Sequence, residues 1–391
     1  MAGGKKFRFW TIPYLRPMRG RSQKYLYERA PLPDNELLLE DVNNAANRLH
    51  QKLESLGIKG LEISDYGKRY LKDQLSDIGA TLQRYAYILA WSIAYQETPR
   101  EKFVFIDYGG GPGILSLLAK ELGIGTVVYN DIYDVSCRDS KMAGQKIGNE
   151  ADLYVEGDID DLIGFLQETS IICDAIATYD VIEHIYDVED FLTKICFLSS
   201  KPYNIVMSSG ANPYNPIIKK RIVRQHLEIE YYDRKKEWGH KERDCLRAYF
   251  KARKKIISES GHELSGSDVD RLARATRGLP EPEIKSWVDK WVRTGELPAG
   301  LNHPTNTCDP YTGNWAERLM DVHQLARILS RGGFEVDVKA GYYGQSSNDF
   351  RKRLLAHLLN PLITVLGSKG LMLSPFYTIY GRKLQSGSHM N

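Results

Sequence analysis

The chain has 391 residues, of which 42% are hydrophobic and 26% charged, and its formal net charge is +3. This composition excludes a wholly disordered or fibrous chain and is typical of a globular protein with one or two domains. Because 53 Lys and Arg residues barely exceed 50 Asp and Glu residues, the balance also argues against a surface coated with charge for nucleic acid.

The cysteines and the chain ends indicate a cytoplasmic protein. The five cysteines are spread out and form no C-x-x-C pair, which is typical of a reducing compartment and argues against disulfides or structural zinc. The basic N-terminal run is interrupted by Pro13 and Pro17, so no secretory signal is expected. The longest apolar stretches fall well short of the roughly 20 residues that a membrane helix needs. Residues 384–391 resemble a cloning scar and are excluded from the fold prediction.

The first hundred residues predict a helical cap. Apolar residues recur at helical spacing from Asp41 to Leu56 and again from Tyr66 to Tyr95. Thr98-Pro99 ends this region, because proline cannot continue a helix. We therefore assign residues 1–100 to a cap that precedes the main domain.

A parallel sheet is predicted next, because short strands alternate with helices. The expected strands are 103–106, 126–129, 152–155, 174–178 and 204–208. The helices between them include 114–122 and 188–198. Such alternation predicts an α/β domain whose sheet is covered on both faces.

The alternation is interrupted by an insertion. Residues 211–319 are polar, basic and mostly helical by pattern, and the strand pattern returns at Phe334–Val338 and Phe376–Tyr380. The economical interpretation is one α/β domain formed by residues 101–210 and 320–383, with residues 211–319 inserted to bind the acceptor.

A glycine-rich turn follows the first predicted strand. The run DYGGGPG occupies residues 107–113 and leads into a helix, so the backbone can approach a ligand closely and free N–H groups face it. A dinucleotide fingerprint, G-x-G-x-x-G, would need glycine at Ile114. The observed order is D-x-G-x-G-x-G.

This order resembles the cofactor loop of the class I S-adenosylmethionine-dependent methyltransferases. The resemblance implies that S-adenosylmethionine is the cofactor and that the loop wraps its methionine part. It also implies that Asp107 helps to hold the amino group, directly or through water. The loop glycines concerned are Gly109, Gly110, Gly111 and Gly113.

Acidic residues after the next two strands extend the resemblance. Asp131, followed by Ile132, stands where the family places its ribose-binding acid, and a carboxylate can accept two hydroxyl groups at once. Asp158 stands where the family has an acid that meets the adenine amino group, and the resemblance implies that Ile159 packs on the ring.

The end of the fourth predicted strand carries a further match. Residues 179–185, YDVIEHI, are similar to the D-x-x-E-H of the ubiquinone-biosynthesis O-methyltransferase-like branch and add Asp180 to the implied cofactor site. Residues 325–338 and 376–383 resemble that family's last helix and final strands. The implied fold is a Rossmann-like, mostly parallel sheet whose last strand is antiparallel.

Methyl transfer to a hydroxyl needs in-line positioning and a base that removes the proton. His184, with Glu183 beside it, is the first candidate; the alternative is a histidine that orients the cofactor loop or caps a helix. His226 is a second candidate, with a solvated helix histidine as the alternative. Trp315 suits either stacking on a sugar or anchoring a loop.

A metal site is the less favoured interpretation. Asp180 and Glu183 are three residues apart and offer oxygen ligands suited to magnesium. Two carboxylates are too few to define a metal site, so none is predicted.

Two basic regions suggest partners. Residues 219–255 hold 14 Lys and Arg against 6 Asp and Glu, which favours either a solvated face or an anionic acceptor such as a nucleotide sugar, a phosphorylated glycan or RNA. Arg351-Lys-Arg353 precedes a leucine-rich stretch that suits peripheral contact with a membrane surface or, as the preferred interpretation, packing on the sheet.

The sequence therefore predicts an O-methyltransferase that acts on a hydroxyl of a small molecule or glycan. The alternatives are an RNA-directed methyltransferase and a non-catalytic binding or assembly subunit. Methylation of nucleic-acid bases is disfavoured, because no Asn/Asp-Pro-Pro-aromatic motif follows the fourth strand. The acceptor and the oligomeric state are left open.

Overall fold

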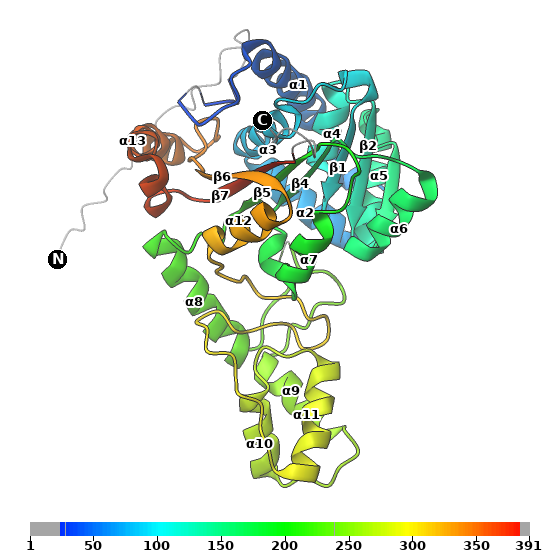
Figure 1. Ribbon diagram of the computed structural model, residues 1–391, viewed down its shortest axis with the longest axis vertical. Coiled ribbons are helices and arrows are strands. Elements are labelled where there is room, and N and C mark those ends of the chain that lie inside the picture. The colour runs from blue at the N-terminus through cyan, green and yellow to red at the C-terminus, as the bar shows by residue number, and fades with distance from the viewer. Residues whose placement is uncertain (1–23, 28, 238, 384–391) are drawn as a thin grey trace, which may run out of the picture.

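A seven-stranded sheet forms the centre of the protein in the computed structural model, which describes residues 24–27, 29–237 and 239–383 (Figure 1). The strands are β1 (Val104–Tyr108), β2 (Thr126–Asp131), β3 (Leu153–Glu156), β4 (Ala175–Tyr179), β5 (Asn204–Ser209), β6 (Phe334–Ala340) and β7 (Tyr377–Lys383). Their order is β3-β2-β1-β4-β5-β7-β6, and β7 alone runs antiparallel to its neighbours β5 and β6. The predicted fold class is confirmed.

The strand order sets the position of the site. The chain moves outward from β1 to β2 and β3, and then returns to β4 on the other side of β1. Ligands of open α/β sheets bind where the order reverses, at the carboxyl ends of the strands. This point lies between the loops that follow β1 and β4.

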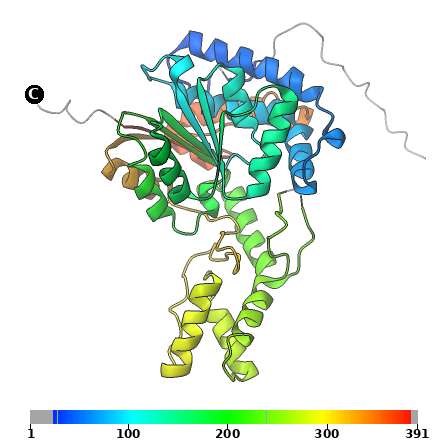
Figure 2. The same cartoon turned by 90° about the vertical axis from the view of Figure 1, so that its right-hand side faces the viewer.

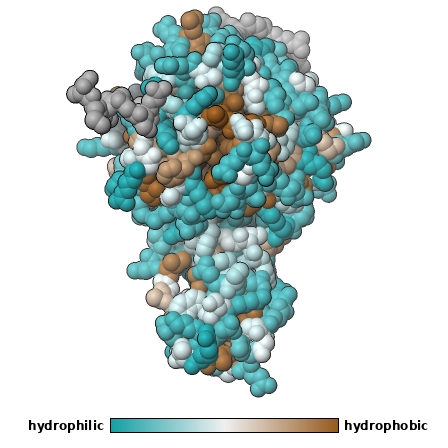
Figure 3. Space-filling model, turned by 45° about the vertical axis from the view of Figure 1, so that its right-hand side comes forward, coloured by the Kyte–Doolittle hydropathy of each residue, from teal (hydrophilic) through white to brown (hydrophobic). Residues whose placement is uncertain are grey.

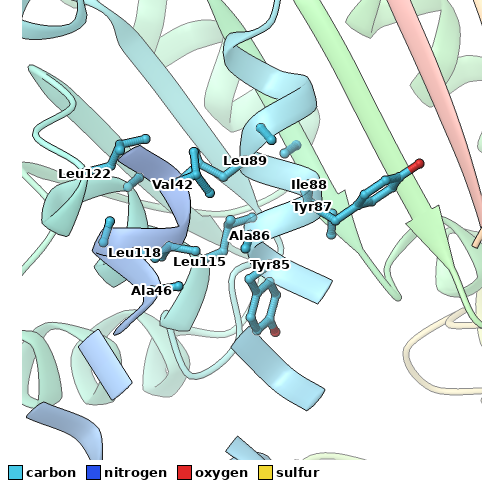
Figure 4. Close-up of a cluster of buried hydrophobic side chains, with 14 of the residues drawn as sticks. Val42, Ala46, Tyr85, Ala86, Tyr87, Ile88, Leu89, Leu115, Leu118 and Leu122 are labelled. Atoms are coloured by element: carbon cyan, nitrogen blue, oxygen red, sulfur yellow. The ribbon is translucent and has the colours of Figure 1, made fainter. Parts of the chain in front are cut away.

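Alternate residues of each strand face opposite sides of the sheet, so each side has its own core. Phe105 and Val127 face the helices α1 (Glu36–Glu54), α3 (Ile78–Ile93) and α4 (Ile114–Glu121). Figure 4 shows Val42 and Ala46 from α1 packing against side chains from α3 and α4. This part of the cap is therefore an integral layer of the sheet domain.

Three helices cover the opposite face of the sheet (Figure 2). They are α6 (Ile159–Thr169), α7 (Val188–Ile195) and α12 (Val322–Arg331). Ile106 and Ile205 point into this core. The remaining helix of the sheet domain's first half, α5 (Asp134–Ile147), packs against β2 and β3.

The predicted helical region 66–95 is divided into two helices. α2 (Asp65–Ser76) ends where Asp77 adopts a non-helical backbone, and α3 follows. The Asp77 carboxylate accepts hydrogen bonds from the Ser347 hydroxyl at 2.7 Å and the Asn348 amide at 2.9 Å. These tertiary bonds explain why the periodic pattern is broken there.

The insertion forms a second lobe below the sheet domain (Figure 1). Its helices are α8 (Pro216–Tyr231), α9 (Tyr249–Ser258), α10 (Gly266–Ala275) and α11 (Glu281–Thr294). The last three have a core of their own, which includes Ile257, Leu272 and Ile284. Figure 3 shows that the visible face of this lobe is largely hydrophilic.

An ion pair is buried inside this lobe. Arg253 and Glu230 are both almost fully buried, and Nη1 of Arg253 lies 3.3 Å from Oε2 of Glu230. Nε of Arg253 also donates to the Ala273 carbonyl at 2.9 Å. Arg253, counted above as part of a basic region, is therefore structural.

The C-terminal helix bears on two predictions: that no apolar stretch is long enough to cross a membrane, and that the leucines after Arg353 pack on the sheet. α13 (Phe350–Leu366) and the following 3₁₀ helix η4 (Gly367–Met372) form a stretch long and apolar enough, by length and composition, to cross a membrane. Only 28% of its apolar window is buried. The preferred prediction that the leucines pack on the sheet is wrong for Leu354, Leu355 and Leu358, which are exposed, whereas Leu359 packs against the sheet core. The length was missed because Arg353 and Pro361 interrupt the apolar pattern without ending the helix.

The predictions about the N-terminal run and about residues 384–391 concern segments outside the described residues.

Candidate cofactor and active site

The loop between β1 and α4 has a shape that only glycine permits. Gly109 and Gly113 have φ values of +69° and +78°, in the left-handed region that favours glycine. A Cβ atom on Gly109 would lie 2.5 Å from Cγ2 of Val181. The loop after β1 therefore packs directly against the loop after β4, and the amide groups before α4 are left close to the sheet edge.

Asp107 stands at the base of this loop and is 3% exposed. Its Oδ2 atom accepts hydrogen bonds from the Ser116 amide at 3.0 Å and the Ser116 hydroxyl at 2.7 Å, which fixes the first turn of α4. Burial raises the pKa of this carboxyl to about 7, although both bonds from Ser116 oppose the shift. A cationic ligand group beside Asp107 would favour its charged form.

Asp131 ends β2 and holds two loops at once. Its Oδ2 accepts from the Gly111 amide at 3.0 Å, and its Oδ1 accepts from the Tyr133 amide at 2.9 Å. Each carboxylate oxygen has a second lone pair, so both can still accept a ligand hydroxyl. The neighbouring Ile132 is 47% exposed, an apolar side chain beside the predicted ribose position.

Asp158 and Ile159 follow β3 at the start of α6. The exposed Asp158 is the N-cap of this helix, and its Oδ1 accepts from the Asp160 amide at 2.8 Å. Ile159 is buried in the core beneath the sheet. The contacts of Asp158 and Ile159 in the structure are therefore a helix cap and a core contact of α6.

Asp180 follows β4 with φ of +52°, a conformation rare for residues other than glycine. Its Oδ1 atom accepts a hydrogen bond from the Gly210 amide at 2.7 Å, which joins the ends of β4 and β5. The resulting turn directs the next residue, Val181, onto Gly109. Strained backbone of this kind collects at functional sites.

Glu183 is buried next to this turn, in a short 3₁₀ helix (Ile182–His184). Its Oε2 atom has no hydrogen-bond partner among the described residues. Burial, and then the negative charge of Asp180, raise the pKa of Glu183 well above its usual range. Burial and the Asp180 charge therefore both favour the neutral form of Glu183.

His184 is oriented by the insertion. Its Nδ1 atom lies 2.8 Å from the backbone carbonyl oxygen of Trp315. Because a carbonyl oxygen only accepts, Nδ1 carries the hydrogen and Nε2 retains its lone pair. The Trp315 amide in turn donates to the His184 carbonyl at 3.1 Å, so the two segments are joined in both directions.

Trp315 anchors this loop, as one of its two interpretations expected. The indole is 3% exposed and stacks on Tyr186 with ring centroids 5.4 Å apart. Its Nε1 atom donates to the Tyr186 carbonyl at 3.1 Å. Little of the ring is left for a sugar.

His226 is placed differently from both predictions. It is fully buried, Nε2 donates to the Glu317 carbonyl at 2.7 Å, and Nδ1 accepts from the Thr307 amide at 3.2 Å. Neither ring nitrogen is left for an acceptor. Burial lowers the pKa of His226 to about 4. These contacts favour a structural role, and the predicted solvated histidine is wrong.

Sequence reasoning missed the contribution of the cap. The ring of Tyr70 on α2 covers Gly111, and the ring of Tyr66 packs edge-on against Tyr133 at 5.3 Å. The helix is held in place because Asp139 accepts hydrogen bonds from Ser64, its N-cap residue. The spacing of the two tyrosines, four apart on one helical face, was the available sequence signal.

The insertion also reaches the predicted ribose position, which no motif indicated. The crossing segment (residues 232–237 and 239–248) places Nζ of Lys241 3.8 Å from Oδ1 of Asp131. Arg243 lies over the Tyr133 ring at 5.0 Å and donates to the Ile132 carbonyl at 3.3 Å. The inserted lobe and the predicted cofactor site therefore meet at Asp131.

Much of the basic charge of residues 219–255 is neutralised locally. Eight of its 14 cations form ion pairs with acidic residues. Among the described residues no group of three or more His, Cys, Asp or Glu side chains is placed to hold a metal ion.

Residues 106–197 match the family model described as a methyltransferase domain. No curated protein shows significant sequence similarity to the chain. The matched segment contains the glycine loop together with Asp131, Asp158 and Asp180, so this part of the chain is a methyltransferase domain. S-adenosylmethionine is the cofactor that the sequence resemblance predicts for this domain.

Solved structures with similar folds have low sequence identity. A methyltransferase from Mesorhizobium loti is 12% identical over 73% of this chain and 94% of its own, with a TM-score of 0.34. Magnesium protoporphyrin IX methyltransferase from Synechocystis is 10% identical over 90% and 100%, with a TM-score of 0.36. A protein from Streptococcus mutans described as an S-adenosylmethionine-dependent methyltransferase is 14% identical over 36% of this chain and 38% of its own, with a TM-score of 0.29. The chain therefore spans well under half of that protein.

The residues present fit this cofactor. A Cβ atom on Gly109 would clash with Val181, so only glycine lets the predicted methionine-binding loop approach the end of β4 this closely. Asp107 has Oδ1 without a hydrogen-bond partner among the described residues, which suits an ammonium group. Asp131 offers two oxygens to a ribose.

Proposed function

We propose that the protein methylates a hydroxyl oxygen of a small molecule or glycan, and that His184 removes the hydroxyl proton. The supporting observation is the 2.8 Å contact between Nδ1 of His184 and the Trp315 carbonyl. It assigns the hydrogen to Nδ1 and leaves Nε2 as the proton acceptor that a general base requires.

The chemistry of the methyl donor determines what the residues of the protein have to do. S-adenosylmethionine, when bound, supplies a methyl group that is electrophilic without further activation. The protein then has to hold the acceptor oxygen in line and accept its proton. Asp107, Asp131 and the glycine loop hold the donor, with Asp158 at its adenine end, and His184 faces the acceptor.

Glu317 supports this role for His184. Burial raises the pKa of Glu317, whereas the charge of a protonated His184 opposes that shift. The two groups are therefore electrostatically linked, and the Glu317 carboxylate would stabilise the imidazolium that forms when His184 takes a proton. Glu183, which is buried, serves as a positioning residue for the turn between Asp180 and His184.

The charge at the edge of the site favours one chemical class of acceptor. Lys241 and Arg243 bring positive charge to the edge of the cofactor site, which suits an acceptor that carries a phosphate or carboxylate. The extensive ion pairing elsewhere in residues 219–255 reduces the charge available to a long RNA. Weak dependence of acceptor binding on salt is therefore expected.

The test is methyl transfer from methyl-labelled S-adenosylmethionine to a panel of phenols, sugars, sugar phosphates and amines. We expect label on a hydroxyl acceptor, and a kcat about 100-fold lower in His184→Gln, the typical contribution of a general base. Calorimetry should show unchanged donor affinity in this variant. His323→Gln, at an exposed position on α12, is the matched control.

Each other outcome contradicts a stated part of the proposal. Label on amines alone would exclude O-methylation, and donor binding without transfer to any acceptor would favour a binding or assembly subunit. An unchanged kcat in His184→Gln would remove His184 as the base. Steep salt dependence of binding to RNA would favour the RNA-directed alternative.

A further inference from the structure

α13 presents an apolar face to the outside of the protein. Its exposed large apolar side chains, together with one from η4, each leave at least 44% of their surface uncovered: Phe350, Leu354, Leu355, Leu358, Leu362, Val365, Leu366 and Met372. Ala356, Asn360 and Ile363 are buried on the opposite side. Scattered exposed leucines are ordinary, but a contiguous stripe of this length on one helix marks an interaction surface.

The helix is held flat against the sheet domain. Asn360, near its middle, accepts from the Tyr343 amide at 2.8 Å and donates to the Tyr343 carbonyl at 3.0 Å. Lys352 at its start pairs with Asp77 at 3.0 Å, and the Thr364 hydroxyl near its end donates to the Arg29 carbonyl at 2.9 Å. Both ends and the centre of α13 are therefore fixed, so the apolar stripe lies along the surface and the helix does not project from it.

The charges on this stretch all have one sign. Residues 350–372 contain four Lys or Arg residues and one histidine, and no Asp or Glu. The basic residues are at the two ends, Arg351, Lys352 and Arg353 before the leucines and Lys369 after them. An apolar stripe flanked by cations is the pattern of helices that lie in the headgroup region of anionic membranes.

The start of α8 adds to the same surface. Asn212 and Asn215 donate to the carbonyl oxygens of Leu371 and Ser374 at 2.8 and 3.0 Å, so α8 begins beside η4. Its first turns expose Ile217 together with Lys219 and Lys220. Figure 1 shows α8 and α13 along the same edge of the molecule.

We propose that α13 is a membrane-surface helix, which inserts its apolar stripe into the headgroup region of an anionic phospholipid bilayer. The lysines at the start of α8 and the basic residues around α13 contact the lipid phosphates. This inference is independent of the methyl acceptor, since no residue of the cofactor site takes part.

The test is flotation of the full-length protein with vesicles. We expect the protein to float with vesicles of phosphatidylcholine and phosphatidylglycerol, and to do so much less with phosphatidylcholine alone. Leu358→Glu/Leu362→Glu should lower the bound fraction by about tenfold or more, because two leucines that enter the bilayer are lost and two anions are added. Lys219→Glu/Lys220→Glu should weaken binding to the anionic vesicles only.

Leu37→Glu/Val292→Glu places the same charges at exposed apolar positions elsewhere and should float like the wild type. S-adenosylmethionine affinity, measured by calorimetry, checks that every variant is folded. Absence of flotation of the wild type, or equal loss in the control, would overturn the proposal. So would a wild-type dimer that becomes monomeric in Leu358→Glu/Leu362→Glu, since a second copy would then cover the stripe.

Discussion

The Nδ1 atom of His184 lies 2.8 Å from the backbone carbonyl oxygen of Trp315, although the two residues are 131 positions apart in the chain. The contact joins the end of the sheet domain's fourth strand to the last segment of the inserted lobe. The orientation of the proposed base therefore depends on a residue of the insertion.

This dependence predicts a positioning role for Trp315. In Trp315→Ala the loop loses its stack on Tyr186, so His184 should be less well held and kcat should fall about 10- to 100-fold. Trp315→Phe keeps the stack and should recover most of the rate. Donor affinity, measured by calorimetry, should be unchanged in both variants; a parallel fall in donor affinity would indicate general loss of structure.

Asp131 should determine donor affinity. Asp131→Asn removes the charge and one of two acceptor oxygens, and loss of a charge-assisted hydrogen bond weakens binding about 10- to 100-fold. Calorimetry with S-adenosylmethionine measures this effect. Asp134→Asn removes an exposed carboxylate three residues away and should bind normally. Equal affinity in wild type and Asp131→Asn would mean that the ribose lies elsewhere.

The sequence predicts the features of this site that depend on local order, but it does not predict those that depend on contacts between distant segments. The positions of Asp131 and the loop glycines at the edge of the sheet were predictable, because the local order of strand, turn and helix places them there. The fold was predictable for the same reason, since alternation of short strands and helices determines a covered parallel sheet.

Contacts between distant segments could not be predicted. The Tyr70 ring over Gly111 and the Lys241 contact with Asp131 are made by elements that carry no motif. His226 read as a surface histidine because its helix is rich in charge, yet the loop at Thr307 and Glu317 buries it. α13 was predicted to be a core helix, because the spacing of its leucines does not show which side of the helix faces the sheet.

His226 should make the fold sensitive to acid. Its pKa is about 4 in the folded protein and about 6.5 when unfolded. Between these values the unfolded chain binds more protons, so stability is lost as pH falls from about 6.5 to 4, by up to about 3 kcal/mol. Thermal unfolding across this range should show a smaller loss in His226→Gln than in the wild type. His357→Gln, on the exposed side of α13, should behave like the wild type.

The buried pair in the lobe should be costly to break. Arg253→Met leaves the Glu230 carboxylate buried without its main partner, which typically destabilises a protein by about 3–5 kcal/mol. Arg224→Met breaks the exposed pair with Glu228 and should cost less than about 1 kcal/mol. Denaturant unfolding of both variants measures the difference; similar losses would show that Arg253 is not desolvated in solution.

The contact of Lys241 with Asp131 has a consequence for engineering and for evolution. A lobe that only recognised the acceptor could be exchanged between enzymes as a cassette. Here Lys241 of the lobe also contacts Asp131 in the wall of the proposed donor site, so a transplanted lobe is expected to change the affinity for the donor as well. Changes of substrate in such a protein are expected to need compensating changes on the sheet side of that wall.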